Sequence, residues 1–460
     1  MLPDFRRKGP KVPRYLPHSL TGNILACDPP SGGAVSVVAT HHPSIESSVL
    51  TERHEAFLER ASAQDSNGDG SAALGAFLTL RLADRAGIHV ADDADAIAYQ
   101  ARATRNFLSS LQSTTEVIHL FEIARIADAV GHGASRHLLC APLLAFAYWL
   151  EQELRLTEAL DVVDTAHRLG EQLRTPDLVA VQLQRARILR MLGRLPEARS
   201  TYLAAGSLAE QVGDAHAVYL SRVGDAIVTR QLGNLPGSEA ALREIVADAS
   251  RDGDRDAEAR ARHDLGVALA QQENHGLAAV ELFAAFTLYD RRSYKLRALS
   301  DLGESFKSMS WYRAAEDAFR LALADPATPQ MRTLTMLELL DLSSLTGNRV
   351  AFESWRRTLR AARATMHPEA AVDLEIKLGV GHGRFGEFAM ARRHFRAAMH
   401  HAKAHRLHAY MFRAEEQLGA LDAGNDREPL AAAAREPAET DPRVGGVADR
   451  LVELRTSAAL

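Results

Sequence analysis

The chain has 460 residues, of which 46% are hydrophobic and 25% are charged, and its formal net charge is −5. A single hydrophobic core stops growing well below this length, so the chain must divide into domains or extend as a repeat array. The negative charge disfavours a general polyanion binder, the apolar runs are too short to cross a membrane, and two cysteines form no disulfide framework.

Residues 1–50 are predicted to form a basic tail that contains several prolines and glycines and has no helical periodicity. Basic residues gather in its first 20 positions, but the apolar core of a secretory signal does not follow them. We therefore expect a cytoplasmic protein.

Residues 51–134 are predicted to form a helical capping region. The spacing of apolar residues predicts helices over 50–61, 71–86, 94–111 and 114–130. The polar run 65–70 separates the first two helices and matches the start of an EF-hand calcium loop. Ala76 stands where that loop needs a bidentate glutamate, so a turn between two helices explains the run equally well.

The strongest pattern is a regularly spaced series of predicted helix breaks in residues 135–424, which are predicted to form an array of helical repeats. The breaks recur every 37 to 40 residues, at Leu154, Gly193, Gly233, Glu273, Ser310, Gly347 and Gly386. This period suits two packed helices, which are the unit of an α-helical solenoid.

Small residues recur around each break, where the two helices of a pair must approach closely. Seven residues before the break stand Ala147, Ala186, Ala226, Gly266, Gly303 and Gly379, with Leu340 as the exception. Five residues after it stand Ala159, Ala198, Ser238, Ala278, Ala315 and Ala391, with Phe352 as the exception. Larger side chains such as Phe319 and Phe395 stand four residues further on, where we expect them to fill the remaining space.

Residues 425–460 are predicted to form a linker followed by a short terminal helix over 447–454. The linker is rich in proline, acidic residues and glycine, which disfavour regular structure.

Two segments resemble the tetratricopeptide repeat. One runs from Leu302 and Gly303 to Pro326, and the other from Leu378 and Gly379 to Ala398. The resemblance covers roughly residues 140–420. The repeat period is longer than the usual one of about 34 residues and resembles that of the long-helix variants in bacterial regulatory proteins. It implies an all-α superhelix of antiparallel helix pairs, whose first helices line a concave groove that binds a peptide, a partner helix or, more rarely, a small effector.

The resemblance also implies which side chains line the groove. They are Tyr148, Gln152, Gln184, Arg187, Arg190, Arg230, Arg260, His263, Asp264, Arg297, Asp301, Glu304 and Lys307, and further along Glu338, Asp341, Lys377 and Arg384. Arginine binds carboxylates with two parallel hydrogen bonds, so we expect a protein or peptide partner with an acidic segment or a C-terminal carboxylate. The alternative is a solvated helix face whose charges pair along the helix.

Motifs for other chemistry are incomplete. The histidine pairs His132/His137 and His400/His401 lack a third ligand at metal-site spacing, and no phosphate loop, dinucleotide fingerprint or nucleophile elbow occurs. We therefore expect a protein that is not an enzyme, has no cofactor or metal, and binds neither membranes nor nucleic acid directly.

Two functions agree with these features. The first is an interaction scaffold or adaptor that holds a partner peptide or helix in the groove. The alternative is a regulatory sensor, in transcription or signalling, whose solenoid binds a small effector or a signalling peptide. The oligomeric state does not follow from the sequence.

Overall fold

The computed structural model describes residues 53–62, 69–88, 94–170, 173–324, 328–405, 407–423 and 441–458. The predicted tail over 1–50 and most of the calcium-loop run lie outside these ranges. Within them all regular structure is helical, which confirms the all-α class. The chain divides into two compact units, and the described residues up to 257 belong to the N-terminal unit and those from 258 on to the C-terminal unit.

The N-terminal unit begins with four helices that precede the repeats. They are α2 (Glu55–Ser62), α3 (Asp69–Ile88), α4 (Ala94–Ser109) and α5 (Thr115–Gly131). The helix predicted over 50–61 begins later than expected, because His54 takes a positive φ of 64° that a continuous helix cannot contain.

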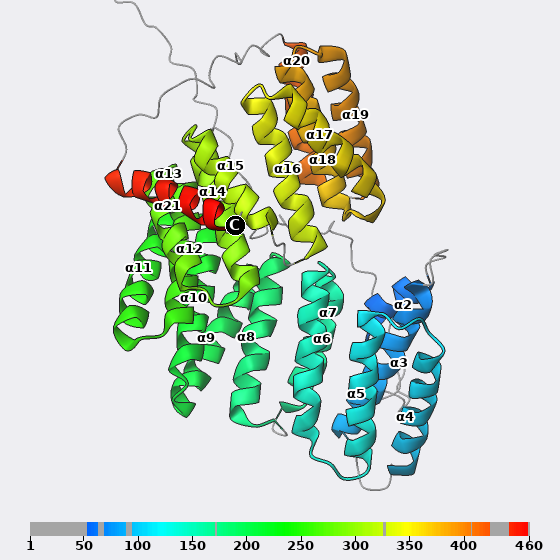
Figure 1. Cartoon of the computed structure of the whole chain (residues 1–460). Coiled ribbons are helices and arrows are strands. Elements are labelled where there is room, and N and C mark those ends of the chain that lie inside the picture. The colour runs from blue at the N-terminus through cyan, green and yellow to red at the C-terminus, as the bar shows by residue number, and fades with distance from the viewer. Residues whose placement is uncertain are drawn as a thin grey trace, which may run out of the picture. The chain divides into compact units, whose positions relative to one another are not determined.

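Three helix pairs follow in the N-terminal unit (Figure 1). The short 3₁₀ helix η2 (Arg136–Leu139) leads into α6 (Cys140–Gln152), α7 (Leu156–Arg168), α8 (Thr175–Met191), α9 (Leu195–Val212), α10 (Ala215–Gln231) and α11 (Leu235–Asp252). One continuous apolar core runs from Phe57 on α2 to Val228 on α10. The four leading helices therefore form one folded body with the first repeats.

The C-terminal unit contains most of α12 and all later helices. They are α12 (Arg255–Gln271), α13 (His275–Leu288), α14 (Arg292–Ser308), α15 (Tyr312–Ala324), α16 (Pro329–Leu345), α17 (Arg349–Ala362), η4 (Arg363–Thr365), α18 (Pro368–Arg384), α19 (Phe388–Ala404), α20 (His408–Asp422) and α21 (Pro442–Ala458). From α12 to α19 they form four pairs, and α20 packs against α18 and α19.

The terminal helix α21 is longer than the predicted 447–454. Proline in its first turn suits a helix start, because an N–H there would have no helical partner. Val444, Val447 and Leu451 are buried, and α21 contacts α13 and α15, as Figure 1 shows. Its Arg455 Nη1 lies 2.7 Å from Asp317 Oδ1 on α15. The helix is therefore part of the folded C-terminal unit.

All seven predicted breaks are confirmed as left-handed residues between the first and second helix of a pair. Their φ angles lie between 58° at Leu154 and 90° at Gly233. Glycine adopts this conformation freely, whereas an L side chain costs roughly 1–2 kcal/mol there. The three breaks without glycine, which are Leu154, Glu273 and Ser310, therefore carry local strain.

We expect Glu273→Gly to raise the free energy of unfolding by about 0.5–1 kcal/mol, because relief of the left-handed strain exceeds the entropy that glycine adds to the unfolded chain. The side chain is exposed, so little packing is lost. Chemical denaturation of wild type and variant measures the change. Gly193→Ala, which introduces the same strain at an equivalent break, is the control with the opposite sign, and a less stable Glu273→Gly protein contradicts the account.

The small residues also stand where the helices of a pair come closest. A Cβ added to Gly303 would lie 2.5 Å from the ring of Phe319, and one on Gly379 would lie 2.5 Å from the ring of Phe395. Phe352 is large where the other pairs have a small residue. Its ring fits because Gly381 on α18 has no side chain at the place that the ring occupies. The predicted small and large positions are therefore partners in the same contacts.

Candidate functional site

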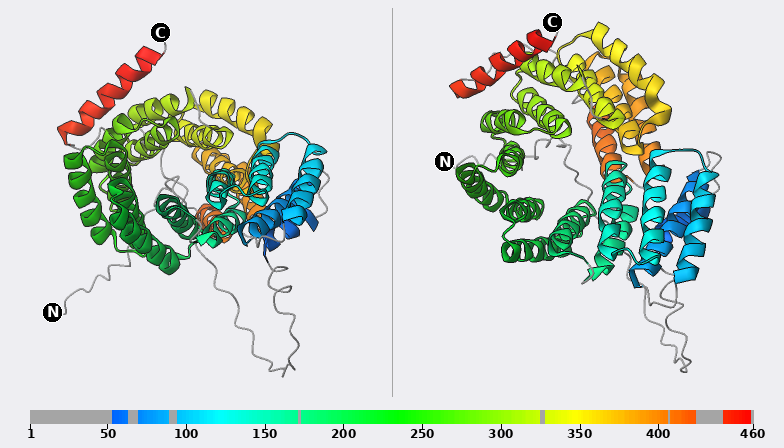
Figure 2. Two further views of the ribbon diagram at one scale, coloured as in Figure 1. Left: turned by 90° about the horizontal axis from the view of Figure 1, so that it is seen from below. Right: turned by 60° about the horizontal axis from the view of Figure 1, so that its bottom comes forward.

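The first and second helices of successive pairs form two layers, which Figure 2 shows for the green helices of the N-terminal unit. Neighbouring first helices contact each other, α6 with α8, α8 with α10, α16 with α18 and α18 with α20, more than neighbouring second helices do. Closer packing on one side curves a row of helices toward that side. The surface of the first helices, named here the first-helix face, is therefore the concave side of each unit.

In the N-terminal unit this face carries arginines around a buried glutamate. The Glu151 side chain on α6 is only 1% exposed, and its Oε1 lies 2.6 Å from Arg187 Nη2 on α8. Arg190, one turn further along α8, is half-buried, and its Nε has no hydrogen-bond partner in the described ranges. Arg230 occupies the equivalent position on α10 and is buried. Arg187, Arg190 and Arg230 thus lie on two neighbouring first helices, with Glu151 on the helix before them.

Two further predicted residues differ in how they meet solvent. Tyr148 on α6 is 39% exposed and offers an aromatic ring on the first-helix face. The side-chain amide of Gln184 donates to the Leu144 carbonyl at 3.3 Å, so it joins α8 to α6. Only Tyr148 of these two is well placed to meet a ligand.

His263 lies inside the C-terminal unit and does not line the groove as the resemblance implied. Its Nε2 lies 2.8 Å from Asp301 Oδ2 on α14, and its Nδ1 lies 3.1 Å from the Tyr289 hydroxyl that follows α13. All three side chains are buried. The reason is local, because this position of α12 points toward α14 and the end of α13. Its role in this arrangement is to hold these helices together.

The other two predicted arginines of α12 and α14 remain near the surface. The Arg260 guanidinium lies over the Tyr294 ring, 4.5 Å from the ring centroid. Arg297 is half-buried and has no ion-pair partner among the residues that the structure describes. Arg297 is therefore a cation that remains available on α14.

Four first helices of the C-terminal unit are joined by a chain of alternating charges. Lys307 Nζ on α14 lies 2.8 Å from Glu304 Oε1, 2.5 Å from Glu338 Oε2 and 3.3 Å from Asp341 Oδ2. Glu338 on α16 also pairs with Lys377 on α18. Both lysine side chains are largely buried.

The chain of charges continues to α20. Asp373 Oδ2 lies 3.2 Å from Lys377 Nζ, and its Oδ1 lies 2.8 Å from Arg413 Nη1. Arg384 Nη1 lies 2.6 Å from Asp341 Oδ1. We call the complete set the charged ladder, and it consists of Glu304, Lys307, Glu338, Asp341, Asp373, Lys377, Arg384 and Arg413.

Neighbouring charges decide how the ladder ionises. Burial and the neighbouring Glu338 raise the pKa of Glu304 well above its ordinary value. Burial also disfavours the charged form of Glu338, but Lys307 and Lys377 hold its pKa well below the ordinary range. The carboxylates raise the pKa of Lys307 against the effect of burial. Glu304 and Lys307, both predicted groove residues, therefore satisfy charges within the protein.

Asp373 and Arg413 were not among the predicted site residues. The signal that could have found them is an opposite-charge pair 40 residues apart, close to the repeat period. Glu338 and Lys377 pair across 39 residues in the same way.

Other kinds of site receive no support from the described ranges. They contain no group of three or more His, Cys, Asp or Glu residues arranged to hold a metal ion. None of the helices in this part of the chain is long and apolar enough to cross a membrane. Of the histidine pair His400/His401, His401 accepts a hydrogen bond at its Nε2 from Arg363 Nη2, at 2.7 Å.

No family model matches the chain, and no curated protein matches it either. Among solved structures it is similar to a Rap protein complexed with competence and sporulation factor, at 12% identity and a TM-score of 0.47, over 75% of this chain and 99% of that chain. It is also similar to a tetratricopeptide repeat protein from Parabacteroides merdae, at 15% identity and a TM-score of 0.39, over 62% of this chain and 98% of that chain. A third similar structure is the apo form of the quorum sensor NprR from B. thuringiensis, at 10% identity and a TM-score of 0.32, over 68% of this chain and 99% of that chain.

The geometry of the repeats themselves identifies the fold. Each pair has a left-handed residue at its break, and glycines such as Gly303 and Gly379 face large side chains across their pairs. Several neighbouring first helices also contact each other. The breaks and the glycines are positions that carried the sequence resemblance. The chain is a solenoid of tetratricopeptide-like helix pairs.

Proposed function

We propose that the chain is a non-enzymatic interaction scaffold that binds an acidic peptide or helix of a partner on the first-helix face of its N-terminal unit. The observation that carries the proposal is the half-buried Arg190, whose Nε lacks a hydrogen-bond partner in the described ranges. Glu151 on the neighbouring helix already pairs with Arg187. Arg190 has no ion-pair partner in the described ranges, so a carboxylate from outside the chain would pair with the accessible part of its guanidinium.

Three features support a peptide as the ligand. A guanidinium binds a carboxylate with two charge-assisted hydrogen bonds, and half-burial protects these bonds from solvent. Tyr148 places an exposed aromatic ring on the neighbouring helix α6, and tyrosine and arginine are enriched among residues that dominate binding energy. The charged ladder, by contrast, is paired within itself, so we assign it to rigidity of the C-terminal unit.

Selection from a displayed peptide library tests the proposal. We expect wild type to enrich peptides with clustered Asp and Glu, and Arg190→Gln to bind the selected peptides about tenfold more weakly or worse, as the loss of a charge-assisted hydrogen bond implies. Arg243→Gln is the matched control, because this arginine is exposed on the second helix α11. Equal affinity of Arg190→Gln and wild type for the same acidic peptides would contradict the proposal.

A regulatory sensor is the second candidate. The division of the repeat array into two compact units favours it, because a ligand can shift a population between arrangements of two units. Small-angle scattering with and without a selected peptide tests this candidate. A change in the radius of gyration at saturating peptide supports a sensor, whereas an unchanged radius supports a scaffold.

A further inference from the structure

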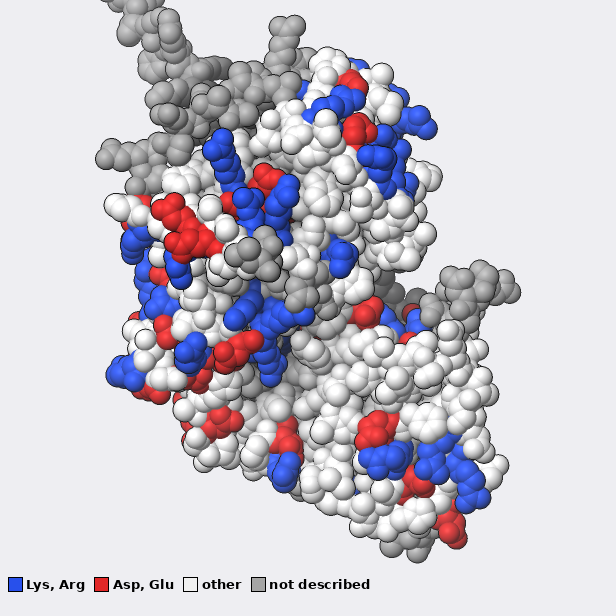
Figure 3. Space-filling model, in the orientation of Figure 1, with Lys and Arg blue, Asp and Glu red and all other residues white. Residues whose placement is uncertain are grey.

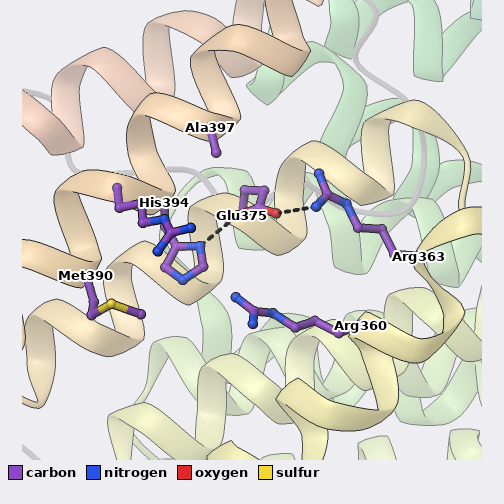
Figure 4. Close-up of a pocket in the computed structure, with 7 residues that line it drawn as sticks. Arg360, Arg363, Glu375, Met390, His394 and Ala397 are labelled. Atoms are coloured by element: carbon purple, nitrogen blue, oxygen red, sulfur yellow. Dashed lines mark hydrogen bonds and ion pairs between the residues drawn. The ribbon is translucent and has the colours of Figure 1, made fainter.

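A cavity of about 240 Å³ lies between the second helices α17 and α19, with η4 and α18 completing its wall. It is lined by Arg360, Arg363, Glu375, Met390, Arg393, His394 and Ala397. Figure 4 shows Arg360 and Arg363 approaching from one side, Met390 and His394 from the other, and Glu375 between them. None of these residues belongs to the charged ladder or to the proposed peptide site.

The single carboxylate of the cavity is already engaged. His394 Nδ1 lies 2.7 Å from Glu375 Oε2, and Arg363 Nη1 lies 3.1 Å from Glu375 Oε1. Glu375 and His394 are both buried. Burial alone would raise the pKa of Glu375, but the hydrogen bond from His394 and the charge of Arg363 lower it below the ordinary value. Glu375 is therefore ionised at neutral pH and fixes the position of both partners.

The remaining two cations of the cavity form no ion pair with Glu375, although the charge of Arg360 also lowers the pKa of that carboxyl. Arg360 and Arg393 are exposed, and neither has an ion-pair partner in the part of the chain that the structure describes. The three arginines and one carboxylate leave a formal charge of +2 in the cavity. The nearby surface has the same sign, since α19 contains three arginines and a lysine but no acidic residue, and Figure 3 shows basic side chains gathered over α17 and α19.

We propose that this cavity binds a phosphate group, either as inorganic phosphate or as the phosphate monoester of a larger molecule. Such a group carries nearly two negative charges at neutral pH, which matches the charge of +2, whereas a carboxylate would leave one cation unneutralised. Arginine forks bind phosphate oxygens with paired hydrogen bonds. One water takes up roughly 30 Å³ of liquid, so the cavity has room for a phosphate with several waters.

Calorimetric titration of the full chain tests the proposal with inorganic phosphate, phenyl phosphate and acetate at constant ionic strength. The cavity variant is Arg360→Gln/Arg393→Gln, which removes two exposed side chains and keeps the contacts of Glu375 with His394 and Arg363. The matched control is Arg357→Gln/Arg396→Gln, because these arginines are exposed on the same two helices and do not line the cavity. We expect the control to bind phosphate like wild type and the cavity variant to bind at least about tenfold more weakly.

The two phosphate probes separate the sources of the ligand. Binding of both probes supports a site for the phosphoryl group of a larger molecule, and binding of inorganic phosphate alone supports a site for the free ion. Three results would overturn the proposal, namely no saturable binding to wild type, equal affinities in the cavity variant and the control, or acetate binding as tightly as phosphate.

Discussion

Replacement of Lys307 by methionine is expected to lower the free energy of unfolding by about 3–5 kcal/mol. The lysine contacts Glu304, Glu338 and Asp341, and its side chain is only 14% exposed. Methionine keeps much of the apolar stem but leaves these carboxylates without their shared cation. Breaking a buried ion pair by removing one partner leaves an uncompensated charge in a region of low dielectric, and this carries a large cost. Chemical denaturation followed by circular dichroism measures the change.

Two further variants isolate the electrostatic part of this effect. Lys403→Met makes the same chemical change at an exposed position of α19 and should alter stability by less than about 0.5 kcal/mol. Adding Glu338→Gln to Lys307→Met should restore part of the lost stability, because it removes a buried carboxylate that has lost one of its two lysine partners. A loss below about 1 kcal/mol for Lys307→Met would mean that the ladder is solvated and does not hold the first helices together.

The repeat register could be predicted from the sequence because each of its causes acts within one helix pair. A left-handed residue such as Gly193 ends a helix wherever it stands, and Gly303 can face Phe319 because both belong to one hairpin. Because the pattern recurs with a regular period, the same local features predict the break in each later repeat. Even Leu154 and Glu273, which lack the usual glycine, were placed correctly by their spacing.

The candidate site could be predicted only in part, because the partners of its charges come from other repeats. The choice of the first helices was sufficient to find Arg187 and Lys307, but it could not show that Arg187 pairs with Glu151 or that Lys307 is shared by three carboxylates. These partners depend on the rotation of one pair relative to the next. The contact of His263 with Asp301 depends on the same rotation, since Asp301 lies on the first helix of the next pair.

Contacts between segments far apart in the sequence could not be predicted for the same reason. The sequence predicts a short terminal helix over 447–454, but nothing local indicates that it packs on α13 and α15 across an intervening linker. The cavity that we propose to bind phosphate is a similar case, because Arg360 and Arg393 come from different pairs. The helices themselves follow from local sequence patterns, whereas the contacts between repeats are defined only by the three-dimensional structure.

Replacement of His54 by glutamine is expected to destabilise the N-terminal unit by about 2–3 kcal/mol at pH 5.5, and by less at pH 8.5. The buried His54 ring precedes α2, and its Nδ1 lies 2.8 Å from Asp161 Oδ2 on α7. Its Nε2 lies 3.3 Å from Asp84 Oδ2 on α3, where the charges attract without a well-aligned hydrogen bond. Arg168 holds Asp84 from the other side at 2.8 Å. Hydrogen bonds to charged groups contribute about 1.5–3 kcal/mol each, and glutamine can replace only one neutral bond.

The pH dependence follows from the directions of the two pKa shifts. Burial opposes the charged form of His54, but Asp161 and Asp84 together raise its pKa above 6.5. A histidine with a raised folded pKa contributes its full stabilisation below the unfolded value and loses it as the pH rises through the folded value. Burial likewise opposes ionisation of Asp84, yet His54 and Arg168 lower its pKa below 3.8, so its contribution is lost only as the pH falls below that region.

The stabilisation by this cluster should therefore be constant between about pH 4 and 6.5 and decline above that range. Thermal melting of wild type and His54→Gln at several pH values measures it, because taking the difference between the two proteins cancels most other titrations. We expect the difference in midpoint to be largest near pH 5.5 and to shrink toward pH 8.5. A difference that stays constant or grows with pH would show that His54 is neutral in the folded protein and acts through packing alone.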